Sequence, residues 1–441
     1  MQAMIVPSNR LLFWVAMLLP FAVLGALVPT AVGTSVTLLV GLLGVAILDA
    51  ARGLRRLNGV HVALPALVRL SCERPGEITL RIRNESRKSR RMRIGLPLAE
   101  SFRSDDDLTV LLPAGARESS CRWHCRPTVR GCFSLDSCYF EMPSPLGFWL
   151  ARGRAASECE LRVYPDLLKE RRSLAALFLN RGTFGMHLQR MVGQGREFEH
   201  LREYIPGDSY EDIHWKATAK RGRPVTKLHQ IERTQEVYVV IDSSRLSARP
   251  IRDEPVLERF LTAALVLCLA AERQGDLFGV LAFADKVGRF IRAGGGHGHY
   301  NACRDTLYTL QPRIVSPDFE DLCSFVRLNL RRRALLLILT DLSDPALAEG
   351  FARNVDMIGR QHLVLVNTIL PPGVGPLFAG EPVADPRQLY ERLGGQILWN
   401  ELRELERTLR RRGVELSSIT DEKMATHLVT QYLNVKRRQI L

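Results

Sequence analysis

Residues 237–244 read VYVVIDSS, and this stretch decides the fold of the C-terminal half of the chain. Five apolar or aromatic residues run without a break and end in an aspartate and two serines. A strand that is buried on both faces has such a continuous run, whereas a half-exposed strand alternates. The stretches ALLLILTDL at 334–342 and HLVLVNTIL at 362–370 have the same form. We therefore predict a parallel sheet with helices on both of its faces.

The segments between these strands support this interpretation. Residues 255–274 form an amphipathic pattern with a proline at its start, which predicts a helix. Asp285-Lys286 separates two short strands and indicates a hairpin. Further helices are expected at about 300–310, 318–330, 345–360, 398–412 and 421–435, with a strand at 414–420. Alternating strands and helices predict one doubly wound α/β domain over residues 236–441.

Ligands of such sheets bind beyond the carboxyl ends of the strands. We expect three loops to meet there, at 242–247, 293–299 and 340–344. Their aspartate and serine oxygens are ligands that suit Mg²⁺ or Ca²⁺. The glycine motifs of dinucleotide-binding folds and the Walker A sequence are absent, so ATP hydrolysis by this chain is not expected.

The domain resembles the von Willebrand factor A fold, which often carries a metal-ion-dependent adhesion site. Asp242, Ser244 and Asp341 stand at three positions of that pattern, and they would hold Mg²⁺. Leu246 stands where a second serine belongs, and the 293–299 loop offers no threonine. The resemblance therefore implies a degenerate site. In the alternative interpretation, Asp242 and Asp341 only cap the helices that follow them.

The N-terminus carries two uncharged apolar runs, at about 11–29 and 31–48. Each is near the roughly 20 residues that a membrane span needs, and a cleaved signal peptide would have one shorter run. Residues 1–57 are therefore predicted to form a two-helix membrane hairpin, rather than a signal peptide or a buried core hairpin. Arginines flank the pair at Arg10 and after residue 51, so both termini and the soluble body are expected in the cytoplasm.

Residues 58–165 alternate polar and apolar positions in short segments broken by turn residues, which predicts a β-sandwich-like domain. The chain has nine cysteines, and five of them lie at 121–159. Because the body is expected in the cytoplasm, they are interpreted as reduced thiols, and their spacing disfavours a zinc site. The net charge of +14 comes from scattered basic residues, which suits membrane lipid here rather than nucleic acid.

Residues 166–235 are predicted to connect the two domains, and they contain REYIPGDSYEDIHWKATAKRG at 202–222. Ile205 to Asp208 indicates a turn. Asp208 or Ser209 would then cap a short helix that contains Ile213 and Trp215. A catalytic alternative would use Asp208, Asp212 and His214 as an acid and base cluster.

This stretch resembles the signature of the bacterial family of domain of unknown function 58. The signature positions are Arg202, Tyr204, Pro206, Gly207, Asp208, Ile213, Trp215, Ala219 and Lys220. A preceding segment, Pro143 to Phe148, resembles the family's β region, with Ser144 where an aspartate is usual. The resemblance extends over nearly the whole chain, including the apolar N-terminus.

The resemblance implies a non-enzymatic protein of the bacterial inner membrane that partners a MoxR-type AAA+ ATPase in assembling or maturing a protein complex. The signature residues would then either contact the partner or serve only as a structural connector that leads into the α/β domain. The alternative is a hydrolytic enzyme that uses either the Asp242 and Asp341 loops or Asp208 and His214. A cell-surface adhesion module would need the opposite membrane orientation, which the flanking arginines disfavour.

Overall fold

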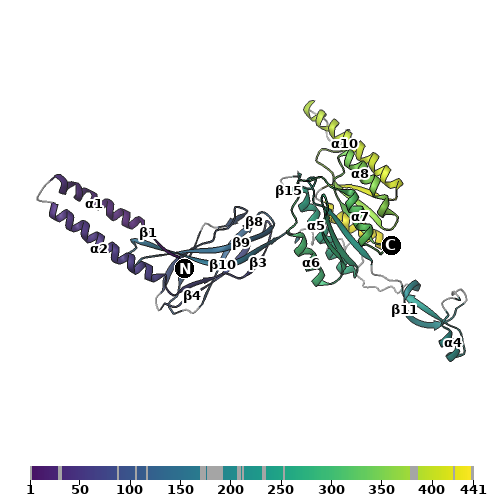
Figure 1. Ribbon diagram of the computed structural model, residues 1–441, viewed down its shortest axis with the longest axis horizontal. Coiled ribbons are helices and arrows are strands. Elements are labelled where there is room, and N and C mark those ends of the chain that lie inside the picture. Colours follow the sequence, from purple (N-terminus) through teal and green to yellow (C-terminus); the bar gives the residue numbers. More distant parts are fainter. Residues whose placement is uncertain are drawn as a thin grey trace. The chain divides into compact units, whose positions relative to one another are not determined.

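The computed structural model divides into two units, Met1–Asp166 and Leu167–Leu441 (Figure 1). It describes residues 2–27, 32–86, 89–104, 107–115, 118–168, 175, 192–205, 210, 213–230, 235–251, 254–377, 386–420 and 423–438. The turn predicted at Pro206-Gly207-Asp208 lies outside these residues.

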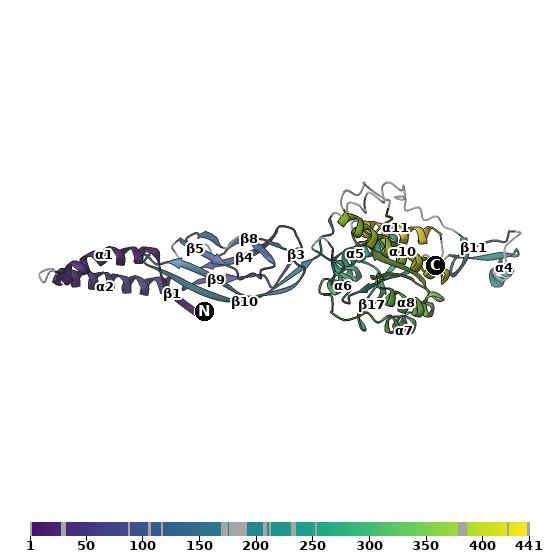
Figure 2. The same cartoon turned by 90° about the horizontal axis from the view of Figure 1, so that it is seen from above.

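Two apolar helices, α1 Asn9–Leu27 and α2 Val32–Arg56, lie side by side in the first unit (Figures 1 and 2). The hydroxyl of Ser35 donates to the carbonyl of Phe21 at 2.7 Å and joins them. By length and composition, α2 is the one helix of the described part that can cross a membrane, and Asn9–Leu24 is a shorter apolar stretch. Only 17% of the apolar span in α2 is buried, whereas the core helix of a soluble protein is mostly buried.

Two sheets follow in the same unit. One has the order β1-β10-β9-β5-β7, with β3 also on β10, and the other has the order β2-β4-β8-β6. The strands are β1 Gln2–Pro7, β2 Val60–Ala63, β3 Leu67–Ser71, β4 Gly76–Asn84, β5 Arg90–Gly95, β6 Phe102–Ser104, β7 Leu108–Leu112, β8 Ser119–Pro127, β9 Gly131–Pro143 and β10 Trp149–Tyr164. Inward residues of both sheets, such as Trp123 and Phe140, share one apolar core, which makes the unit a β-sandwich.

Strand β1 was not expected from the sequence. It pairs with β10 from Gln2 to Pro7 and brings the start of α1 beside the sheet. The end of α2 is tied to the sandwich as well, through a buried carboxylate. Asp49 is 1% exposed and accepts hydrogen bonds from Ser144 Oγ, Leu146 N at 2.9 Å and Phe148 N at 3.2 Å. These hydrogen bonds join the C-terminal part of α2 to the turn between β9 and β10 of the sandwich.

The second unit contains a six-stranded sheet of order β17-β16-β13-β18-β19-β20. All neighbours are parallel except β17, which pairs antiparallel with β16. The strands are β13 Glu236–Asp242, β16 Leu277–Phe283, β17 Val287–Gly294, β18 Leu335–Leu339, β19 Leu363–Ile369 and β20 Glu415–Ile419; the short hairpin β14 Pro250–Ile251 and β15 Glu254–Pro255 follows β13. This mixed α/β architecture agrees with the expectation from the three apolar strands.

Helices cover both faces of this sheet (Figure 2). On one face lie α5 Val256–Gln274, α6 His297–Leu307 and α11 Met424–Arg438. On the other lie α7 Phe319–Asn329, α8 Pro345–Asn354, α9 Asp356–Gly359 and α10 Pro386–Arg411. Strands that are buried from both sides need apolar residues at every position, which explains why β13 and β18 do not alternate. Helix α10 begins twelve residues earlier than the predicted 398.

The signature residues belong to a small separate element, a hairpin of β11 Val192–Glu203 and β12 Val225–Gln230. Between its strands lies α4 Trp215–Arg221. The predicted helix here starts later than expected, because Ile213 forms a bridge with Thr226 instead of a helical turn. We call this element, residues 192–230, the signature arm.

Candidate functional site

The predicted metal residues Asp242 and Ser244 lie where β13 ends. The sheet places them beside Thr340, since β13 and β18 are neighbours and their carboxyl ends share one edge. Thr340 Oγ1 donates to Asp242 Oδ2 at 2.6 Å, and Ser244 N donates to Asp242 Oδ1 at 2.8 Å. Asp242 is fully buried. Burial raises the pKa of its carboxyl group, and the bonds from Thr340 and Ser244 oppose that rise.

The third predicted ligand, Asp341, lies at the same edge and has a positively charged partner. Arg249 Nη2 is 3.0 Å from Asp341 Oδ2, and Ser343 N donates to Asp341 Oδ1 at 3.0 Å. Arg249 reaches this place because the chain turns back after Ser244, where Ser247 Oγ donates to the Ser244 carbonyl at 2.9 Å. Sequence reasoning missed Arg249, which is seven residues beyond Asp242 in an irregular segment.

The prediction that the 293–299 loop joins this edge is wrong. Strand β17 runs antiparallel, so its end, Gly294, pairs with Phe278 at the start of β16. The loop therefore lies at the opposite edge of the sheet. There His297 starts α6, and His299 Nε2 is 2.5 Å from the Phe278 carbonyl.

Residues 313–316 take the place that was expected for that loop. Arg313 N donates to the Ser243 carbonyl at 2.7 Å, and Arg245 N donates to the Val315 carbonyl at 2.9 Å. Arg245 Nε also donates to Ser316 Oγ at 3.2 Å. We call these residues, with 242–249 and 340–343, the carboxyl edge.

The carboxyl edge fits a divalent cation poorly. The Ser244 hydroxyl already accepts from Leu246 N at 3.3 Å, and leucine offers no further oxygen. A cation beside Asp341 would also meet the guanidinium of Arg249. The carboxylates are satisfied by backbone N–H groups and side chains of their own loops. They do not cap the helices that follow, because α5 begins after Pro255 without a side-chain cap and α8 is capped by Asp344.

The signature arm has a very small core of its own. Ile213 is 7% exposed and Val225 is fully buried. His214 caps α4, since its Nδ1 accepts from Ala217 N at 3.0 Å, and the left-handed Gly222 ends the helix. Arg202 and Tyr204 lie on β11 and just after it, and Lys220 lies in the last turn of α4.

Two aromatic side chains of the arm are largely exposed. Trp215 is 69% exposed and Tyr210 is 75% exposed, and the apolar side chain of Ile205 is 51% exposed. Tyr210 stacks on Tyr204 with ring centroids 6.0 Å apart. The described part of the signature therefore leaves three large apolar side chains exposed, which we call the aromatic patch: Ile205, Tyr210 and Trp215.

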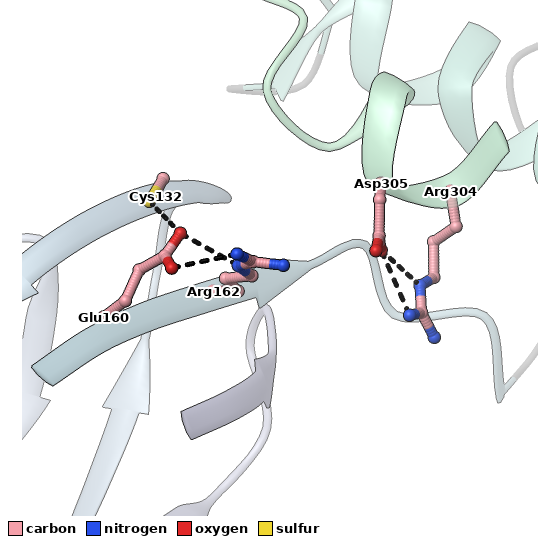
Figure 3. A network of polar contacts seen from close by, with 5 residues as sticks. All are labelled: Cys132, Glu160, Arg162, Arg304 and Asp305. Atoms are coloured by element: carbon pink, nitrogen blue, oxygen red, sulfur yellow. Dashed lines mark hydrogen bonds and ion pairs between the residues drawn. The ribbon is translucent and has the colours of Figure 1, made fainter. Parts of the chain in front are cut away.

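Two other polar features lie elsewhere. A cleft of about 720 Å³ lies between α10 and β20, lined by Trp399, Arg403 and His427 among others, and no predicted site residue lines it. On the sandwich, the bonds from Arg162 and Cys132 hold the pKa of Glu160 at about 2 (Figure 3). Arg162 and Glu160 form an ion pair on the sandwich, and Arg304 and Asp305 form another pair on α6.

Comparison with known families gives one match by sequence model. Residues 200–373 match a family described as "Protein of unknown function DUF58". Proteins named "Uncharacterized protein Rv1480" in Mycobacterium tuberculosis and "Uncharacterized protein Mb1516" in Mycobacterium bovis are each 25% identical over 190 residues. The match covers 43% of this chain and 59% of each relative. The chain thus aligns with less than two thirds of the curated relatives' length.

Solved structures share about half of the chain at low similarity. An aerotolerance-related membrane protein of Bacteroides fragilis is 14% identical over 45% of this chain and 98% of its own, with a TM-score of 0.25. Pilus adhesin SpaC of Lactobacillus rhamnosus GG is 8% identical over 46% of this chain and 30% of its own, with a TM-score of 0.30. Likenesses at this level decide nothing about function.

Proposed function

Because the chain belongs to the DUF58 family through residues 200–373, we propose that it is a non-enzymatic, membrane-anchored adaptor. Its partner is an AAA+ ATPase of the MoxR type, as the resemblance of the signature implies. The pair would assemble or mature a protein complex. The adaptor contributes a membrane anchor, a spacer sandwich and a docking surface.

The observation that carries this proposal is the aromatic patch. Trp215 and Tyr210 are large apolar side chains that the arm leaves in solvent. Exposed aromatic residues of this kind are the usual anchors of protein interfaces. A two-stranded hairpin is also marginally stable by itself, so the arm gains from binding another surface. The family's defining segment thus has the properties of a contact site.

The hydrolase alternative receives no support from the described side chains. His214 Nδ1 accepts the bond that caps α4. Asp242 and Asp341 accept bonds from Thr340, Ser244 and Ser343. A general base must be free to take a proton from a substrate. Asp208 lies outside the described residues.

The α/β unit supports the docking role in a second way. Its strand order, with one antiparallel edge strand, is the arrangement that we associate with a von Willebrand factor A-like domain. Such a domain presents its carboxyl edge to partners. In this proposal the carboxyl edge binds a second protein, or it makes an additional contact with the AAA+ ATPase that stabilises the complex.

We further propose that α1 and α2 both cross the bacterial inner membrane and leave both termini and the soluble body in the cytoplasm. A reporter enzyme that works only in the periplasm should stay inactive when fused after residue 441. The same reporter inserted between residues 29 and 30 should become active. Activity of the C-terminal fusion would reverse this topology.

The partner can be tested by purifying the full-length tagged chain from gently solubilised native membranes. A MoxR-type AAA+ ATPase should co-purify and be identified by mass spectrometry. An untagged strain provides the background. Recovery of other proteins without any AAA+ ATPase would contradict the adaptor role.

A further inference from the structure

The carboxyl edge carries a positive charge that belongs to the protein. We propose that Arg249 replaces the divalent cation of an adhesion-type site, so that this edge works without metal. The proposal goes beyond the adaptor role, since it concerns the chemistry of the edge and holds whichever partner binds.

The first argument is the ion pair. Arg249 Nη2 is 3.0 Å from Asp341 Oδ2, a contact that is an ion pair without hydrogen-bond geometry, and this nitrogen is buried although 40% of the whole side chain remains exposed. Asp341 is only 7% exposed on its side chain. The guanidinium therefore neutralises a nearly buried carboxylate at the place where the third metal ligand was predicted.

The second argument is the donor set. Leu246 stands where another hydroxyl would be needed, and its own N–H occupies the hydroxyl oxygen of Ser244 at 3.3 Å. The Thr340 hydroxyl donates to Asp242, which leaves that carboxylate with a protein partner on each oxygen. Leu246, which offers no side-chain oxygen, and Arg249, which supplies a positive charge, thus stand in the same loop.

A third argument comes from the surrounding charges. Arg245 and Arg313 also lie at this edge, where Arg245 Nε donates to Ser316 Oγ and the charge of Arg313 is balanced by Asp285 at 2.6 Å. A divalent ion beside Asp341 would therefore meet the guanidinium of Arg249, and like charges repel. The exposed part of the Arg249 side chain can still donate hydrogen bonds to a carboxylate of a partner protein. This one consequence rests on the proposed docking function.

The test is a titration of the full-length chain in detergent with MnCl₂ and MgCl₂, followed by calorimetry and thermal unfolding. The wild-type chain should show no saturable binding up to millimolar metal and no change in Tm. The double variant Leu246→Ser with Arg249→Ser restores an oxygen and removes the cation. It should bind Mn²⁺ at one site and gain several degrees in Tm, and a third change, Asp341→Asn, should abolish both effects.

Two outcomes would overturn the proposal. One is saturable, one-to-one metal binding by the wild-type chain that Asp341→Asn abolishes. The other is a folded double variant that stays indifferent to Mn²⁺. If the double variant does not fold, Arg249→Gln removes the charge at similar length and replaces it in the test, with Arg249→Lys as the charge-retaining control. The proposal is supported if the Arg249→Gln chain binds Mn²⁺ and the Arg249→Lys chain does not. It is contradicted if neither chain binds Mn²⁺.

Discussion

Replacing Trp215 by alanine should release the AAA+ partner and leave the adaptor folded. The indole is 69% exposed and lies at the first position of α4, whose residues include no buried side chain. Its loss therefore removes little packing from the arm. At an interface, an exposed tryptophan of this kind is typically worth about 2 kcal/mol or more. That corresponds to roughly a 30-fold weaker complex.

The measurement compares the amount of ATPase retained by wild-type and variant chains, together with the Tm of each chain. Leu328→Ala is the matched control, because Leu328 is a similarly exposed apolar residue on α7, at 74%, outside the signature. It should leave retention unchanged. A Trp215→Ala chain that loses its fold would assign the tryptophan a structural role, and undiminished retention would remove it from the interface.

Replacing Asp49 by alanine should give the largest loss of stability in the first unit. The substitution leaves the N–H groups of Leu146 and Phe148 and the hydroxyl of Ser144 without their acceptor in a buried place. Each unsatisfied group costs about 1–3 kcal/mol, so we expect a total of roughly 3 kcal/mol or more. The turn would then separate from the end of α2.

Unfolding in detergent can be followed by tryptophan fluorescence. Trp149 contributes to this signal, and its Nε1 donates to the Ala46 carbonyl of α2 at 2.8 Å. Asp49→Asn keeps one acceptor oxygen and should cost less than Asp49→Ala. Arg52→Ala, an exposed change one turn away on the same helix, should be nearly neutral. Equal stability of the Asp49→Ala and Arg52→Ala chains would show that the carboxylate does not join α2 to the sandwich.

The sequence predicted the parts of the fold that depend on local patterns. The continuous apolar run of β13 and the alternation of β4 reflect burial on two faces and on one face, so both could be recognised. The positions of Asp242 and Asp341 at one edge followed from parallel neighbours. The 293–299 loop was misplaced even though the hairpin at Asp285 was expected, because an antiparallel strand ends at the other edge.

Other features depend on contacts between distant residues. Arg249 meets Asp341 across 92 positions of the chain only because β13 and β18 are adjacent. Asp49 binds a turn about 95 residues later, and nothing in an apolar helix marks its last acidic residue as a buried acceptor. His214 looked like a candidate base, since a side-chain cap and a catalytic histidine have the same sequence pattern.

The central claim is that the signature arm docks an AAA+ ATPase, and a photo-cross-link tests it most directly. A benzophenone amino acid placed at residue 215 is irradiated in living cells, with the same group at residue 328 as the control. We predict that position 215 alone gives a covalent product that contains a MoxR-type ATPase. The account would be contradicted by products at 215 that lack any AAA+ ATPase, or by equal ATPase capture at both positions.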